Sequence, residues 1–177
     1  MQIYQIDFNY AFALADVVTS KPGADSLELS SDRPELFDDF GYDWLTDESK
    51  AIPDFILIMH AILGCKQSLY QDLTNILDGL GTHPIKVGKD DYLLFSDIPV
   101  ISKCLNLKKS KISYFSDGDI MDIKEPVFLP GDYPNLFQVK QMPSTFFCNQ
   151  LFKNEIDTRS LVGLLFNKIV MKSKSWF

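Results

Sequence analysis

Histidine and cysteine are scarce in this sequence, and their spacing argues against the common metal and disulfide sites. The two histidines, His60 and His83, form no HxH or HExxH pattern of the kind that holds zinc. The three cysteines, Cys65, Cys104 and Cys148, are odd in number and lie far apart without a CxxC pair. We therefore expect no metal site and no disulfide framework, with the thiols reduced in or near the core.

Long hydrophobic runs and export signals are also missing. The longest apolar run, residues 55–63, is too short to span a bilayer and contains a histidine. The residues after Met1 lack the cationic stretch of a secretory signal, and a carboxylate appears as early as Asp7. We therefore expect a cytoplasmic protein that has no membrane partner.

Motifs for catalysis or nucleotide binding are absent as well. The chain has no GxSxG, no Walker loop and no GxGxxG. We expect the adjacent acids at 38–39 and 90–91 to lie in solvent and not to share a magnesium ion, because neighbouring side chains point apart in a strand. Catalysis by a Cys–His pair stays open, since Cys65 or Cys104 could meet a histidine in the folded chain. We expect neither a cofactor nor enzymatic activity.

Cations are rare in the first third of the chain. Residues 1–60 carry twelve carboxylates and three cationic side chains, whereas residues 61–177 carry twelve and fourteen. The first third therefore holds a charge of −9 within a net −7, which argues against a nucleic-acid partner. The acidity peaks in residues 31–48, where seven acids alternate with aromatic side chains. This pattern predicts either a surface for a basic partner or an acidic loop that covers its own core.

The remaining composition is that of a folded domain. Hydrophobic residues make up 46% of the 177 residues, which predicts one domain, with an acidic N-terminal segment (1–50) and a core region (51–170). Alternation and turn residues predict short strands, several of them joined as hairpins. The expected strands are residues 2–8, 54–60, 82–87, 91–95, 111–115, 120–123, 127–129, 136–140 and 161–170.

Two helices are expected among these strands. Apolar spacing predicts one over Lys66–Leu80, and a second from an N-cap at Ser144 to Asp157. Residues 11–18 could be helical or extended, and residues 19–51 are expected to form a long loop with one short helical turn. The fold class we predict is α+β, with a mainly antiparallel sheet of short hairpin-linked strands and two principal helices.

A series of short motifs follows in a fixed order along residues 50–170: Ile52–Phe55, Lys89–Phe95, Leu105–Ser110, Asp117–Ile120, Asn135–Val139, Phe147–Lys153 and Leu161–Ile169. The order and spacing of these motifs resemble the immunity protein 11 family. One departure from the family pattern is Asn106, which stands where an aspartate is usual.

The resemblance implies a non-enzymatic bacterial protein that is encoded beside a toxin and neutralises it by binding. Toxins that act on nucleic acids carry basic clefts, so an acidic inhibitor could occupy such a cleft as a phosphate mimic. We predict that the acidic segment supplies the contact, with Phe40 and Trp44 as apolar anchors. The carboxylates of the predicted toxin-binding set are Asp38, Asp39, Asp43, Asp47 and Glu48.

Two other functions stay open. A small intracellular enzyme would require the Cys–His pair considered above. A self-assembling structural or regulatory protein would use hydrophobic strands as its interface. A homodimer is also compatible with the toxin-binding hypothesis.

Overall fold

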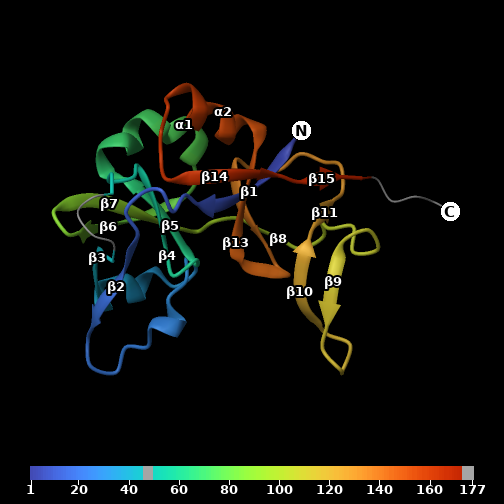
Figure 1. The fold of residues 1–177 in the computed structure, drawn as a ribbon, viewed down its shortest axis with the longest axis horizontal. Coiled ribbons are helices and arrows are strands. Elements are labelled where there is room, and N and C mark those ends of the chain that lie inside the picture. The colour runs from blue at the N-terminus through green and yellow to red at the C-terminus, as the bar shows by residue number, and fades with distance from the viewer. Residues whose placement is uncertain (46–49, 173–177) are drawn as a thin grey trace.

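The computed structural model describes residues 1–45 and 50–172. Within them the chain forms fifteen strands, most of them paired antiparallel, and few helices, so the fold is broadly α+β and rich in sheet. Two large sheets account for eleven strands, and two small ribbons account for the rest (Figure 1). The predicted α+β class and antiparallel character are confirmed.

The five-stranded sheet brings the two ends of the chain together. Its order is β14-β1-β13-β12-β8, and the N-terminal strand pairs antiparallel with β13 on one side and β14 on the other. The expected first strand is thus confirmed as an interior strand. The bounds are β14 Leu164–Lys168, β1 Ile3–Phe8, β13 Met142–Asn149, β12 Leu136–Val139 and β8 Val100–Ile101.

The six-stranded sheet has the order β2-β3-β6-β7-β5-β4. The predicted hairpin around Gly88 is confirmed as β6–β7, and this glycine has the positive φ (59°) that the turn requires. Strand β3 pairs with β6 in parallel and with β2 antiparallel. The bounds are β2 Ala15–Ser20, β3 Phe40–Trp44, β6 Gly81–Val87, β7 Asp90–Ser96, β5 Ile62–Lys66 and β4 Phe55–Ile58.

The two ribbons lie beside the five-stranded sheet. One is the antiparallel hairpin β9 (Lys111–Tyr114) and β10 (Ile120–Glu125), which confirms the hairpin predicted around Gly118. The other is a parallel pair, β11 (Val127–Phe128) and β15 (Val170–Met171).

The helices differ from the prediction. The segment expected as one helix consists of a 3₁₀ helix, η3 (Gln67–Leu73), followed by the short α1 (Thr74–Leu77). The second helix, α2 (Gln150–Thr158), begins six residues after Ser144. Residues up to Asn149 continue β13 instead, because they pair with strands on both sides. Asn149 is the true N-cap, and its Oδ1 accepts from the amide of Phe152 at 3.1 Å.

The segment expected as a long loop contains a strand. Besides η1 (Ser26–Glu28) and η2 (Pro34–Asp39), it holds β3. Phe40 and Tyr42 are buried while Asp43 between Tyr42 and Trp44 is exposed, which is the period of two of a half-buried strand. The density of acids and glycine concealed that alternation. Residues 11–18, for which both conformations were open, end in the extended β2.

Three hydrophobic clusters alternate with the two sheets. Strand β4 shows the pattern: Phe55 and Leu57 belong to the cluster between the sheets, while Ile56 and Ile58 belong to the outer cluster of the six-stranded sheet. Strand β1 likewise turns Ile6 inward, and Ile3 toward a third cluster on the far face of the five-stranded sheet. The β7-β5-β4 part of the six-stranded sheet is therefore buried on both faces, and the outer face of the sheet needs a cover.

The acidic segment is that cover. Phe37 of η2 is fully buried in the outer cluster together with Leu29, Phe40 and Tyr42. The hydroxyl of Tyr42 donates to the carbonyl of Phe37 at 3.0 Å, which ties η2 to β3. The prediction that aromatics fold the acidic segment over the chain's own core agrees with this packing.

We predict that Phe37→Ala lowers the free energy of unfolding by about 3–5 kcal/mol, because it leaves a cavity under the acidic segment. Leu27→Ala is the matched control, since Leu27 is 85% exposed in the same segment and its truncation should cost under about 0.5 kcal/mol. Urea denaturation measures both values. A loss below about 1 kcal/mol for F37A would mean that the segment lies outside the cooperative core.

Candidate functional site

Five of the seven predicted contact residues fall within the described chain. Asp38 and Asp39 end η2, and Phe40, Asp43 and Trp44 belong to β3. The other two, Asp47 and Glu48, lie outside the described residues. Asp38 and Asp39 thus lie on the cover of the six-stranded sheet, and the other three lie on a strand of that sheet.

The two aromatic anchors are not equivalent. Phe40 is only 8% exposed and packs into the outer cluster, so it is not free to enter a partner, and the prediction for this residue is wrong. Trp44 is half-buried, with its ring edge-on to Tyr92 at 5.9 Å between centroids. Alternation along β3 turns both aromatics toward the core, and a contact surface at this strand must rely on the opposite face.

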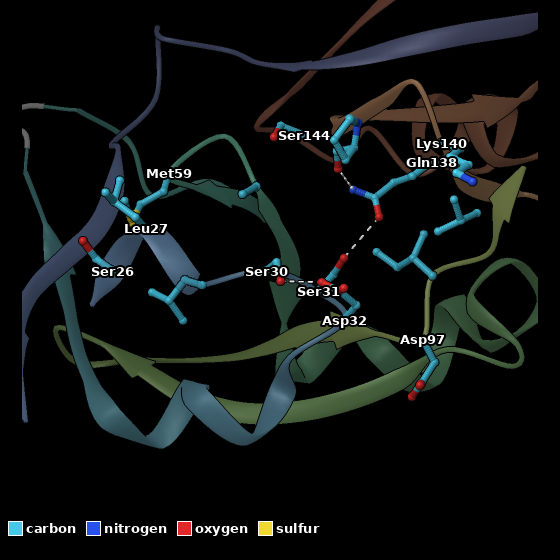
Figure 2. Close-up of a pocket in the computed structure, with 15 residues that line it drawn as sticks. Ser26, Leu27, Ser30, Ser31, Asp32, Met59, Asp97, Gln138, Lys140 and Ser144 are labelled. Atoms are coloured by element: carbon cyan, nitrogen blue, oxygen red, sulfur yellow. Dashed lines mark hydrogen bonds between the residues drawn. The ribbon is translucent and has the colours of Figure 1, made fainter. Parts of the chain in front are cut away.

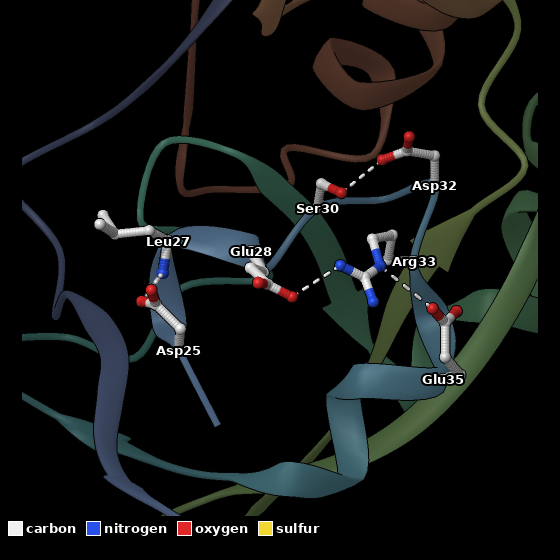
Figure 3. Close-up of polar contacts among 7 residues, drawn as sticks. All are labelled: Asp25, Leu27, Glu28, Ser30, Asp32, Arg33 and Glu35. Carbon is white, nitrogen blue, oxygen red and sulfur yellow. Dashed lines mark hydrogen bonds and ion pairs between the residues drawn. The ribbon is translucent and has the colours of Figure 1, made fainter. Parts of the chain in front are cut away.

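Several carboxylates of the segment are paired with cations from the same chain. Asp38 contacts Nε2 of His83 at 2.9 Å, and Asp39 pairs with Lys21 at 3.0 Å. Arg33 bridges Glu28 at 2.7 Å and Glu35 at 3.2 Å (Figure 3). These hydrogen bonds, the one to Glu35 first, raise the pKa of the Arg33 guanidinium. Exposed pairs of this kind contribute about 0–1 kcal/mol each, so they shape the segment more than they stabilise it.

Other acids bind backbone or hydroxyl groups within the segment. Asp25 caps η1 by accepting from the amide of Leu27 at 2.9 Å, and Asp32 accepts from the hydroxyl of Ser30 (Figure 3). Much of the acidity that looked available for a partner thus already has a local role.

Asp16 and Asp43 differ from the other acids of the segment because they face each other across a ladder. They occupy directly opposite positions in the β2–β3 ladder. Each carboxylate accepts from the amide of the next residue, at 2.8 Å in both cases. Across residues 1–45 and 50–172 no cation forms an ion pair with either of them. Like charges facing each other across a ladder destabilise the pair of strands, so this site carries an uncompensated negative field.

A cavity of about 590 Å³ adjoins the cover, between the 26–32 loop, the β4–β5 turn, the β7–β8 connection and strands β12 and β13 (Figure 2). Ser31 donates to Oε1 of Gln138 at 3.2 Å, and Nε2 of Gln138 donates to the carbonyl of Pro143 at 2.5 Å. These bonds join the acidic segment to the five-stranded sheet. The described lining offers serine hydroxyls, Asp32, Asp97 and Lys140, but neither cysteine nor histidine.

The cysteines lie in environments that suppress nucleophilic chemistry. All three are buried and free. Burial raises the pKa of Cys65 to about 12 and that of Cys104 to about 11, and it also raises the pKa of Cys148. A catalytic thiol needs a lowered pKa and access to substrate, so the geometry disfavours the Cys–His alternative.

The histidines have other partners. Nε2 of His60 lies 3.5 Å from the hydroxyl of Tyr10, and His83 contacts Asp38 as described. Among the described residues, no three side chains of His, Cys, Asp or Glu gather as metal ligands. Nor does any helix in that part of the chain have the length and apolarity to cross a membrane.

Comparison with known proteins leaves the chain without an assigned family. No family model matches it, and no curated protein is significantly similar to it.

Reasoning from the sequence missed both the aspartate pair and the cavity. Asp16 lay in the segment whose conformation was undecided, and only the β2–β3 register places it opposite Asp43. The cavity joins residues more than a hundred positions apart, such as Ser31 and Gln138, and no local pattern could have indicated it.

We predict that the native protein reacts with no thiol reagent at about pH 8, since its thiols are protonated and buried, whereas denatured protein exposes thiols of pKa about 8.5. A disulfide-exchange dye should report three thiols per chain only after denaturant is added. Stability should fall as pH rises from about 9 toward about 12, because over that window the folded state keeps the Cys65 proton that the unfolded state releases. Fast labelling of one native thiol would contradict the assignment.

Proposed function

We propose that this chain is an immunity protein, which binds a cognate bacterial protein toxin with a basic surface and neutralises it in the cytoplasm of the producing cell. The observation that carries the proposal is the cross-strand pair Asp16 and Asp43, with which no cation of residues 1–45 and 50–172 forms an ion pair. The motif order that resembles the immunity protein 11 family supports the same function. In this proposal the protein is not an enzyme and needs no cofactor.

The aspartate pair favours a cationic partner on energetic grounds. Holding two carboxylates opposite each other costs stability in the free protein. A lysine or arginine of a bound protein would remove that cost and add charge-assisted hydrogen bonds. The surplus negative charge of the first third would also speed the encounter with a basic surface.

The contact surface is then the face of β2 and β3 that carries Asp16 and Asp43, opposite the face that packs into the outer cluster. We further propose that residues 1–177 act as one domain, in which 1–50 carries this surface. Residues 51–170 form the scaffold, with 67–77 and α2 as its two principal helical elements.

Self-assembly is the second candidate, and the edge position of β2 favours it. An unpaired strand edge is a template for pairing with another chain, and Val18 on this strand is 47% exposed. Two copies that met at this edge would also bring their Asp16–Asp43 pairs close together, which opposes a homodimer here.

We predict that Asp16→Asn with Asp43→Asn slows association with the toxin about tenfold or more at low salt, since it removes the local field while it keeps the hydrogen-bond acceptors. The free protein should become more stable by about 0.2–1 kcal/mol, because the repulsion is relieved. Biolayer interferometry with the purified product of the toxin gene adjacent to this one measures the rate, and growth rescue on co-expression measures neutralisation.

The matched control is Asp78→Asn with Asp132→Asn, which makes the same change in net charge at exposed positions outside β2 and β3. Equal on-rates for the two double variants would reject the aspartate pair as the contact. Failure of the unchanged protein to bind the toxin or to rescue growth would reject the immunity function itself.

A further inference from the structure

The β9–β10 hairpin projects from the body of the molecule, and its turn points away from both large sheets (Figure 1). The hairpin is fastened at its base, where Lys111 pairs with Glu125 at 3.0 Å. On its inner side Ile123 is buried in the third cluster, and Ile112 and Ile120 pack against that cluster. A two-stranded ribbon is marginal alone, so this packing is what holds it in a fixed position.

The outer end of the hairpin exposes apolar side chains that the core does not use. Tyr114 is 55% exposed, Phe115 54% and Met121 52%. Aromatic residues and methionine are enriched in the buried centres of protein interfaces. These three exposed apolar side chains fall within eight residues of one hairpin, so covering them would be favourable.

The turn that carries these side chains is closed and ordered. The amide of Phe115 donates to the carbonyl of Asp119 at 2.9 Å, and Gly118 returns a bond to the carbonyl of Phe115 at 3.1 Å. The carboxylate of Asp117 accepts from the amide of Asp119 at 3.1 Å. Because the turn is pre-organised, a partner would lose little affinity to the cost of ordering it.

The charge of the hairpin specifies the kind of partner. The hairpin carries four carboxylates and two lysines, and Lys111 pairs with Glu125 at its base. The remaining charges are Asp117, Asp119 and Asp122 against Lys124, so the outer part of the hairpin is negative. A surface that combines apolar side chains with this charge is complementary to an apolar depression rimmed by lysine or arginine. Repulsion between the same carboxylates disfavours a second copy of this hairpin as the occupant.

We infer that the β9–β10 hairpin is a second contact element, which inserts Phe115 and Met121 into a basic-rimmed apolar depression on a partner protein. This inference rests on the proposed function, in that the partner is the same toxin. A specific interface buries about 800 Å² on each side, more than one hairpin tip supplies, so the hairpin acts beside a larger contact.

The test is Phe115→Ser with Met121→Ser, measured against the purified product of the adjacent toxin gene. Side-chain truncation leaves the backbone bonds of the turn intact, and loss of buried apolar contacts should raise the dissociation rate at least tenfold with the association rate within about twofold. Leu151→Ser with Leu165→Ser is the matched control, since these side chains are 57% and 45% exposed on α2 and β14.

A second variant tests the hairpin without touching its apolar side chains. Ser116→Lys places a cation in the exposed turn and should weaken binding about tenfold through repulsion by the basic rim. Thermal unfolding confirms that each variant is folded.

The outcomes separate the two proposals. Unchanged dissociation for both hairpin variants, with binding by the original protein intact, overturns the hairpin inference alone. Absence of any binding by the original protein overturns the immunity function together with it. Sedimentation that reveals a dimer dissolved by F115S/M121S assigns the hairpin to self-association, and so also overturns it.

Discussion

Burial of strands β4, β5 and β7 on both faces is the constraint on which the rest of the structure depends. In β4 and β5 apolar side chains point both ways, so one face packs against the five-stranded sheet and the other needs a separate cover. Each large side chain left in water on that face would forfeit about 1.5–3 kcal/mol. The N-terminal segment must therefore fold back over the sheet, and it does so through Leu29 and Phe37.

The same constraint divides the acidic segment into two chemical roles. Alternation in β3 commits its aromatics to the core and leaves Asp43 outside, which is why the carboxylates and the aromatics cannot act together there as one contact. The acids around η1 and η2 have local partners: side chains of Lys21, Arg33 and His83 contact four of them, and an amide and a hydroxyl donate to Asp25 and Asp32. What remains for a partner is the place where two strands bring Asp16 and Asp43 face to face. The negative charge at this pair arises because the register of β2 and β3 sets two aspartates opposite each other, and not because acids are dense in the local sequence.

Local chemistry made part of the fold predictable from the sequence. The hairpins at Gly88 and Gly118 were expected because their turns need positive φ, which depends on neighbouring residues only. The start of α2 was misplaced because Ser144 is as good a cap as Asn149 in isolation, and the choice is made by the pairing of β13 with β1 and β12. The strand β3 and the contact between Ser31 and Gln138 depend likewise on residues distant in the chain. Of the proposed contact pair, Asp43 belongs to the set predicted from the sequence, whereas Asp16 required the register.

Acids occur together with aromatic side chains both in residues 31–48 and in the β9–β10 hairpin, but only the hairpin exposes the two kinds together at the surface. In the acidic segment a sheet face lies below the aromatics and takes them up. In the β9–β10 hairpin the inner positions are filled by Ile112, Ile120 and Ile123, so Phe115 and Met121 have no cluster left to enter. Composition alone therefore cannot identify a contact surface, because the same residue types are core or surface according to what lies beneath the strand. An apolar side chain stays at the surface when no packing position in a core cluster is open to it. In this hairpin the isoleucines already fill those positions.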